Sequence, residues 1–153
     1  MEKTGKILRK RLVWWVLLLI VLLAAGIRWR LLEIPLERDE GEYAYAGQLI
    51  LQGIPPYEQM YSMKLPGIYA AYACILAIFG QTHIAIHLCL LFINAATIVL
   101  IFFVARHVGD SVTGLASAAC FALLSVSQSV QGVFANAEHF VILPAVGGVF
   151  PPD

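Results

Sequence analysis

The stretch LVWWVLLLIVLLAAGI, from Leu12 to Ile27, decides the fold class of this chain. It contains no charged residue, and two further apolar residues, Ile7 and Leu8, precede the basic residues at positions 9–11. A helix of roughly 20 apolar residues is long enough to cross the hydrocarbon core of a bilayer. The sequence therefore predicts a membrane-spanning helix over residues 7–27. An A-x-A cleavage site does not follow it, so we expect this helix to be retained rather than removed as a signal peptide.

The first eleven residues are basic, with Lys3, Lys6, Arg9, Lys10 and Arg11. Short segments rich in Lys and Arg remain on the cytoplasmic side of a membrane. Residues 1–11 are thus predicted to form a cytoplasmic N-terminus, and the chain is expected to emerge on the outer side after the first span.

The composition indicates a membrane protein that crosses the bilayer several times. The chain is 60% apolar and 13% charged, whereas globular domains contain about 25% charged residues. Ten of the charged residues lie between Arg28 and Lys64, and residues 66–105 and 111–137 contain no Asp, Glu, Lys or Arg. Membrane segments separated by one polar loop explain this distribution. A lipid bilayer is the expected environment, and no nucleic-acid partner is expected.

The outer loop is assigned to residues 28–83. It contains one further apolar segment near its end, and three more follow it. Residues 84–105 and 111–130 are long enough to be spans. Residues 65–79 are too few for a full crossing and are predicted to form an interfacial or re-entrant helix. Residues 140–150 begin another span that is incomplete at eleven residues, so we expect the chain to be a truncated product.

The topology depends on the segment 65–79. If it crosses the membrane, Arg106 lies outside; if it does not, Arg106 is cytoplasmic, and Glu138 emerges on the same outer side as Asp39 and Glu40. Its length and the positive-inside rule both favour the second arrangement.

The polar loop begins with the acidic stretch ERDEGEYAYAGQLILQG, residues 37–53. It predicts an amphipathic helix of about eleven residues that begins at Asp39 and ends at Gly53. Asp39 and Glu42 have the spacing of a capping box, which would explain both acids structurally. That interpretation leaves Glu40 unexplained, so a functional site remains the alternative.

Two further charged residues have open interpretations. Lys64 precedes the short apolar segment, where it can mark the membrane boundary by extending its ammonium toward water or can bind the phosphate of a lipid. Glu138 stands between two apolar segments, where it is either an ordinary loop acid or part of a site at the membrane surface.

The order of these motifs resembles that of the GT-C superfamily of membrane glycosyltransferases. An acidic pair follows the first span, then a Tyr-rich helix with a Gly-Pro turn, Lys-x-Pro-Gly-x-Tyr and Phe-Gly, and later Ala-Arg-His-x-Gly and Ala-Asn-Ala-Glu-His-Phe. The similarity is greatest to protein O-mannosyltransferases and to the aminoarabinose transferases of lipid A, and it covers about Leu12 to Gly148. It implies an all-α polytopic membrane protein, in which residues 12–150 are the N-terminal part of a GT-C fold with interfacial helices in the first outer loop.

The resemblance assigns roles to four residues. Asp39 matches the family's first-loop acid, the expected catalytic base or metal-contacting residue, and Glu40 is the second member of its acidic pair. Lys64 matches the residue that binds the donor phosphate, and Glu138 matches the acid of the second outer loop. Met63 stands where some relatives have another acid, which leaves open whether a divalent cation is needed.

The implied reaction is transfer of a sugar from a polyprenyl-phosphate-linked donor to a glycolipid, polysaccharide or protein acceptor outside the cytoplasmic membrane. The implied location is the inner membrane, with the active loop outside. Because a complete enzyme of this class has many more spans, we do not expect these residues to be active alone. The alternative is a small non-enzymatic membrane protein or a transporter fragment.

Overall fold

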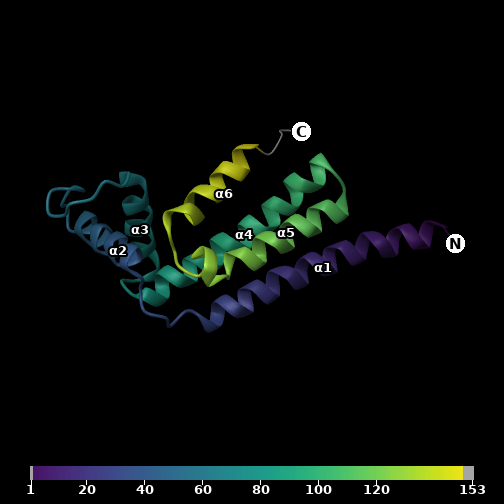
Figure 1. Ribbon diagram of the computed structural model, residues 1–153, viewed down its shortest axis with the longest axis horizontal. Helices are drawn as coiled ribbons and strands as arrows, with labels where there is room; N and C mark the ends of the chain where they lie inside the picture. Colours follow the sequence, from purple (N-terminus) through teal and green to yellow (C-terminus); the bar gives the residue numbers. More distant parts are fainter. Residues whose placement is uncertain (1, 150–153) are drawn as a thin grey trace.

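The computed structural model describes residues 2–149, with side chains from residue 11 onward, and helices are the only regular secondary structure in this part of the chain (Figure 1). The expected all-α class is confirmed. The helices are, in chain order, α1 (Glu2–Arg30), α2 (Arg38–Leu51), α3 (Pro66–Phe79), α4 (His83–Val108), α5 (Ser111–Ser125), the 3-10 turn η1 (Gln128–Val130) and α6 (Ala137–Val149). Phe150, the last residue of the expected segment 140–150, lies outside the described residues.

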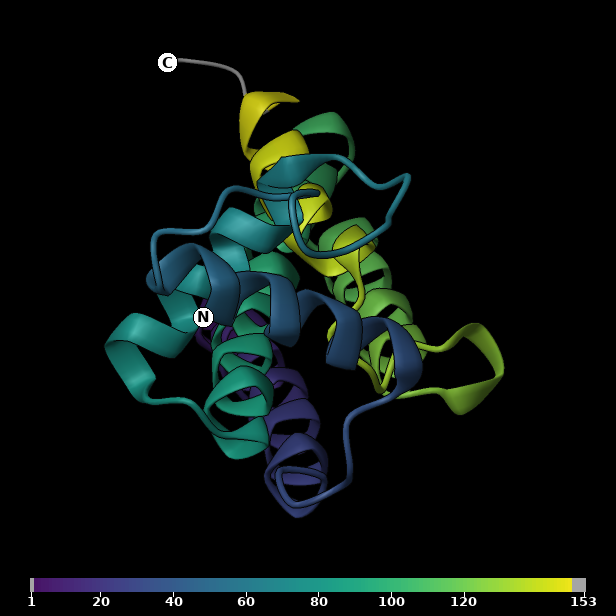
Figure 2. The same cartoon turned by 90° about the vertical axis from the view of Figure 1, so that its left-hand side faces the viewer.

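Two long helices, α1 and α4, form the body of the structure together with α5 and α6, and the pair α2 and α3 covers one of its ends. The helices α1, α4 and α5 pack against one another, and α6 packs along α4. The pair α2 and α3 lies beyond the C-terminal end of α1 and the N-terminal end of α4 (Figure 1). Figure 2 shows α2 crossing in front of the ends of the long helices. The short pair thus forms a cap that contains the acidic stretch.

Two of the described helices are long and apolar enough to cross a membrane. They comprise Arg11–Arg30 in α1 and His83–Val108 in α4, and they coincide with the expected segments 7–27 and 84–105. On one face of α1 the apolar side chains remain exposed, as at Trp15 (66%) and Leu22 (58%), whereas Leu17 and Ala24 are buried.

The expected third span, 111–130, is wrong in its length. Helix α5 ends at Ser125, so its fifteen residues rise only about 22 Å at 1.5 Å each, and the non-helical segment after it completes the return to the cap, where Ala135 contacts Glu40. Arg28 of α1 provides the physical reason, because its buried guanidinium donates hydrogen bonds to the carbonyl oxygens of Ser125 and Gly132, the latter at 2.7 Å. Those bonds hold a turn at the C-terminal end of α5, where the sequence also becomes rich in Ser and Gln.

The last helix begins earlier than its apolar residues indicate. Helix α6 starts at Ala137, so Glu138 lies in its first turn rather than in a loop. An acid is favoured there by the helix dipole. Of the two interpretations of Glu138, that of an ordinary loop acid does not agree with this position in a helix.

Two buried apolar clusters organise this arrangement. One lies between α1, α4 and α5 and is centred on Phe102, Ile98 and Ala118. The other lies under the cap and contains the aromatic side chains of Tyr43, Tyr69 and Tyr72, together with residues from the start of α4. The second cluster supports the acidic stretch from below.

We predict that Gly114→Ala destabilises the contact between α4 and α5. A Cβ atom at position 114 would lie 2.8 Å from the carbonyl oxygen of Phe102, so the two backbones would have to move apart. Overpacking of this kind costs about 1–3 kcal/mol. The measurement is the thermal unfolding midpoint of the purified chain in detergent, which should fall.

Gly26→Ala is the matched control, because a Cβ atom at position 26 of α1 meets nothing within 4 Å. Alanine also has the higher helix propensity, so this variant should melt no lower than the parent protein. Equal midpoints for the two variants would contradict the close packing of α4 on α5.

Candidate functional site

The N-terminus of α2 is capped by residues two positions earlier than the sequence indicates. Glu37 is the N-cap, and its side chain accepts a hydrogen bond from the backbone N–H of Asp39 at 2.8 Å. The backbone N–H of Glu37 donates in return to Glu40 Oε2 at 2.8 Å. The capping box expected for Asp39 and Glu42 is therefore wrong. Both of those side chains are left for other contacts.

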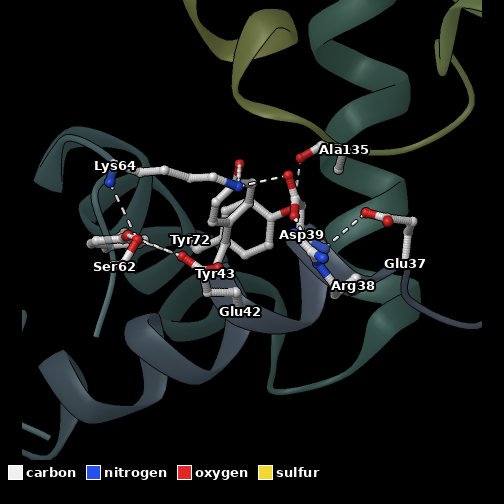
Figure 3. Close-up of polar contacts among 10 residues, drawn as sticks. Glu37, Arg38, Asp39, Glu42, Tyr43, Ser62, Lys64, Tyr72 and Ala135 are labelled. Carbon is white, nitrogen blue, oxygen red and sulfur yellow. Dashed lines mark hydrogen bonds and ion pairs between the residues drawn. The ribbon is translucent and has the colours of Figure 1, made fainter. Parts of the chain in front are cut away.

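Asp39 and Lys64 meet at the start of α2. Lys64 Nζ lies 2.6 Å from Asp39 Oδ2, and it also donates to the hydroxyl oxygen of Tyr43 at 2.8 Å. Figure 3 shows the lysine side chain extending across Tyr43 toward Asp39. The side chain of Lys64 is 35% exposed and that of Asp39 is 31% exposed, so the ion pair is accessible to molecules in the solvent.

The segment before α3 directs Lys64 toward Asp39, because its successive side chains point to alternate sides. Ser62 and Lys64 point toward α2, whereas Tyr61, Met63 and Leu65 are between 82% and 92% exposed. Successive side chains of an extended chain point to opposite sides. Met63, which stands where some GT-C proteins have an acid, therefore faces away from Asp39.

A second polar cluster borders the ion pair. Ser62 donates a hydrogen bond to Glu42 Oε1 at 2.7 Å, and the hydroxyl of Tyr69 donates to Ser62 Oγ. The Lys64 backbone N–H also donates to Ser62 Oγ at 3.2 Å. Tyr57 donates to the Lys64 carbonyl oxygen at 2.6 Å. These bonds fix the backbone on both sides of the lysine.

The ion pair stabilises the charged forms of both of its members. The hydrogen bond from Lys64 lowers the pKa of Asp39, against a smaller opposing effect of desolvation. Burial alone would lower the pKa of Lys64, but its bonds to Asp39 and Tyr43 outweigh that effect and raise the pKa. Asp39 is consequently an ionised carboxylate, and Lys64 an ammonium, at neutral pH.

Glu40, the other member of the acidic pair, turns into the protein. Its side chain is 0% exposed, and Oε1 accepts a hydrogen bond from the backbone N–H of Ala135 and lies 3.2 Å from His87 Nε2. Burial raises the pKa of Glu40, but the bonds from His87, Ala135 and Glu37 together lower it. Because both of its oxygens accept hydrogen bonds from the protein, Glu40 has a structural role. It faces the protein interior, whereas the Asp39–Lys64 pair faces the solvent.

Glu138 lies apart from Asp39 and Lys64 but at the same end of the long helices. It is exposed, and its charge is felt at Tyr43. Together with Asn136 and His139 it lines a pocket of about 340 Å³ between α5 and α6. Of the four residues singled out in the sequence, the structure brings only Asp39 and Lys64 into direct contact.

The residues around Asp39 do not fit a divalent cation. Such an ion takes several oxygen ligands, but Asp39 Oδ2 already accepts a hydrogen bond from the ammonium of Lys64 at 2.6 Å. Glu40 faces inward, and Glu42 is held by Ser62. Among the residues that the structure describes, no three His, Cys, Asp or Glu side chains converge on a possible metal position.

Sequence reasoning missed three residues of the site. Tyr43 follows Asp39 by four positions, so their shared helix face could have identified it. Ser62 could have been found from its alternation with Lys64. His87 lies 47 positions from Glu40, and no local pattern connects the two.

Comparisons of the chain with protein-family models, with curated proteins and with solved structures found no match. The assignment of the site therefore depends on its geometry and on the motifs of the sequence.

We predict that Glu40→Ala strongly destabilises the protein. It would leave His87 and the backbone N–H groups of Ala135 and Glu37 without their acceptor. Removing one partner of a buried ion pair costs about 3–5 kcal/mol. The measurement is denaturant unfolding, with the exposed acid Glu58→Ala as the control that should change stability little. A loss as small as that of the control would show that Glu40 does not hold the cap.

The same carboxylate makes stability depend on acid pH. Because the pKa of Glu40 is lower in the folded than in the unfolded protein, the folded state gains stability above the unfolded value, about 4.3. That gain is lost as the pH falls through the folded value. The thermal midpoint should therefore fall as the pH is lowered below about 4.5, and less steeply in Glu40→Gln. Parallel profiles for the two proteins would contradict this assignment.

Proposed function

We propose that this chain carries the first catalytic loop of a GT-C-type membrane glycosyltransferase, which transfers a sugar from a polyprenyl-phosphate-linked donor to an extracytoplasmic acceptor. The observation that carries the proposal is the exposed contact between Asp39 and Lys64. It joins the two residues that the resemblance assigns to the base and to the donor phosphate, although they are 25 positions apart in the sequence.

The proposed location is the inner membrane, with the N-terminus in the cytoplasm and the cap outside. Two apolar helices of sufficient length support it, as do the exposed apolar side chains of α1, which lipid would cover. Helix α3 is short and lies in the cap rather than beside α4 over its length (Figure 1). In this topology α2 and the start of α6 share the outer side, which is the arrangement that the charges of the sequence favour.

One N–H donor of Lys64 is available for a hydrogen bond to a phosphate. An ammonium has three N–H donors, and Asp39 and Tyr43 account for two of them. In the proposed reaction the third makes the first contact with an oxygen of the donor phosphate, which then competes with Asp39 for the ammonium. A fixed cation there stabilises the charge that accumulates on the phosphate as its bond to the sugar breaks.

Asp39 acts as the general base on the acceptor hydroxyl. The hydroxyl oxygen forms a bond to the anomeric carbon, its proton passes to Asp39, and the electron pair of the broken C–O bond leaves with the lipid phosphate. The ion pair with Lys64 makes Asp39 a weak base in the resting protein, since it lowers the pKa of the carboxyl group. A phosphate that draws the ammonium away raises the basicity of Asp39 when the donor is bound.

A transporter is the less well supported alternative. Transporters bind their substrates near the middle of the membrane, between interrupted helices. Helix α4 is continuous and has no charged residue between His87 and Arg106. Its polar side chains Asn94 and Thr97 donate to backbone carbonyl groups of the same helix.

We predict that Asp39→Asn and Lys64→Ala impair different steps of transfer. Removing a general base lowers kcat by about 10²–10⁴-fold. Removing the ammonium should chiefly raise the KM for the donor, by about tenfold or more, because hydrogen bonds to charged groups contribute about 1.5–3 kcal/mol. The measurement is transfer of labelled sugar from a polyprenyl-phosphate donor into host-cell membranes by the reconstituted protein, together with any further spans that its gene encodes.

Glu33→Gln, an exposed acid of the same loop, is the control and should transfer sugar at the parental rate. Membrane insertion of each variant is checked by its resistance to alkaline extraction. Undiminished transfer by Asp39→Asn would remove Asp39 from the mechanism, and undiminished donor affinity in Lys64→Ala would remove the phosphate contact.

A further inference from the structure

The most deeply buried charged pair of the described residues lies directly behind the site. The side chains of Glu40 and His87 are 0% and 4% exposed. His87 Nε2 lies 3.2 Å from Glu40 Oε1, and Nδ1 lies 3.0 Å from the carbonyl oxygen of Leu32. Neither residue touches Lys64, so the proposed reaction does not use this pair directly.

The partners of His87 decide how many protons its ring carries. A backbone carbonyl can only accept, so Nδ1 must donate to Leu32. Glu40 already accepts hydrogen bonds from the backbone N–H groups of Ala135 and Glu37, which favour its ionised form. An ionised carboxylate is also only an acceptor, so Nε2 must donate as well. His87 is therefore an imidazolium in this arrangement.

The charges that surround the ring are few. Glu40 faces it from α2, Arg28 acts on it from α1, and His83 lies one turn away on its own helix with the ring centroids 6.4 Å apart. Arg28 is occupied by carbonyl oxygens of the turn after α5. Glu40 thus supplies the negative charge that compensates the imidazolium.

This pair sets the rotation of α2 about its own axis. Consecutive residues of a helix point about 100° apart, so the direction in which Glu40 is held determines the direction of Asp39. Glu40 is tied to α4 through His87 and to the segment before α6 through Ala135. With Glu40 fixed on the inner side, Asp39 is presented to Lys64.

We propose that His87 is a positioning residue of the Asp39–Lys64 site. As a buried imidazolium between Glu40 and the Leu32 carbonyl oxygen, it holds α2 in the rotation that keeps Asp39 against the ammonium. The inference rests on the proposed function only for the importance of that site; the geometry itself can be tested without donor or acceptor.

The first experiment measures the protonation of His87 by NMR of the intact chain with ¹⁵N-labelled histidine. The signals of His87 among the four histidines are identified by their loss in His87→Gln. At about pH 7.5, where a free histidine is mostly neutral, both ring nitrogens of His87 should carry a proton. A neutral ring would overturn the imidazolium and with it the proposal.

The second experiment measures the reactivity of Lys64 toward an acylating reagent, by mass spectrometry. The amine reacts only when uncharged, and contact with Asp39 keeps it charged. Each unit by which the pKa of Lys64 falls raises the reactive fraction about tenfold. Asp39→Asn is the positive control. His87→Gln keeps an N–H group for Glu40 but removes the charge, and it should increase labelling several-fold.

His83→Gln is the matched control, because it makes the same substitution one turn earlier at an exposed position of α4. It should leave labelling unchanged. Glu40→Gln should resemble His87→Gln, and the double variant should label no faster than the single ones, because both remove one interaction. Additive increases would point to separate effects.

Loss of folding is separated from loss of positioning by circular dichroism and thermal melting of each variant at the labelling temperature. A folded His87→Gln protein whose Lys64 labels as slowly as in the parent would overturn the proposal. Failure of the proposed function is recognised independently, since it would leave sugar transfer unaffected by Asp39→Asn whatever the labelling shows.

Discussion

The arrangement of the cap depends on the burial of one carboxylate, that of Glu40. A charged group removed from water costs several kcal/mol unless hydrogen bonds and an opposite charge replace its solvation. Here the replacements come from three segments: the start of α2, helix α4 and the segment before α6. None of these segments can move away without exposing an unsatisfied charge, so the carboxylate holds together parts of the chain that are distant in sequence.

Two adjacent acids consequently serve opposite purposes. The helix that begins at Arg38 directs Glu40 inward and Asp39 toward the solvent. The inner acid has a fixed set of partners from the protein, whereas the outer acid shares a partly exposed ammonium with Tyr43. Rigidity on one side of α2 is what allows an open, polar contact on the other side to keep a defined geometry.

Local patterns predicted much of the fold, because apolar length and turn residues act over short distances. They identified α1, α3 and α4, and they placed Lys64 just before α3. The end of α5 was missed because Arg28, almost a hundred positions earlier, donates a hydrogen bond to its last carbonyl oxygen, that of Ser125. The capping residues of α2 were missed for a related reason: Glu37-x-x-Glu40 and Asp39-x-x-Glu42 have the same spacing, and contacts with His87 and Lys64 decide between them.

Two of the ion pairs at the start of α2, Asp39–Lys64 and Glu40–His87, differ in whether they can exchange partners. A solvent-exposed salt bridge contributes about 0–1 kcal/mol, so an incoming phosphate can compete for Lys64 with little energetic penalty. The buried pair of Glu40 and His87 has no such freedom, because separating it would leave an uncompensated charge in the protein interior. In the proposed reaction, donor binding therefore changes the partner of Asp39 without disturbing the helix that carries it. In that reaction the separation would let a carboxylate whose charge is compensated in the resting protein become a base when the donor binds.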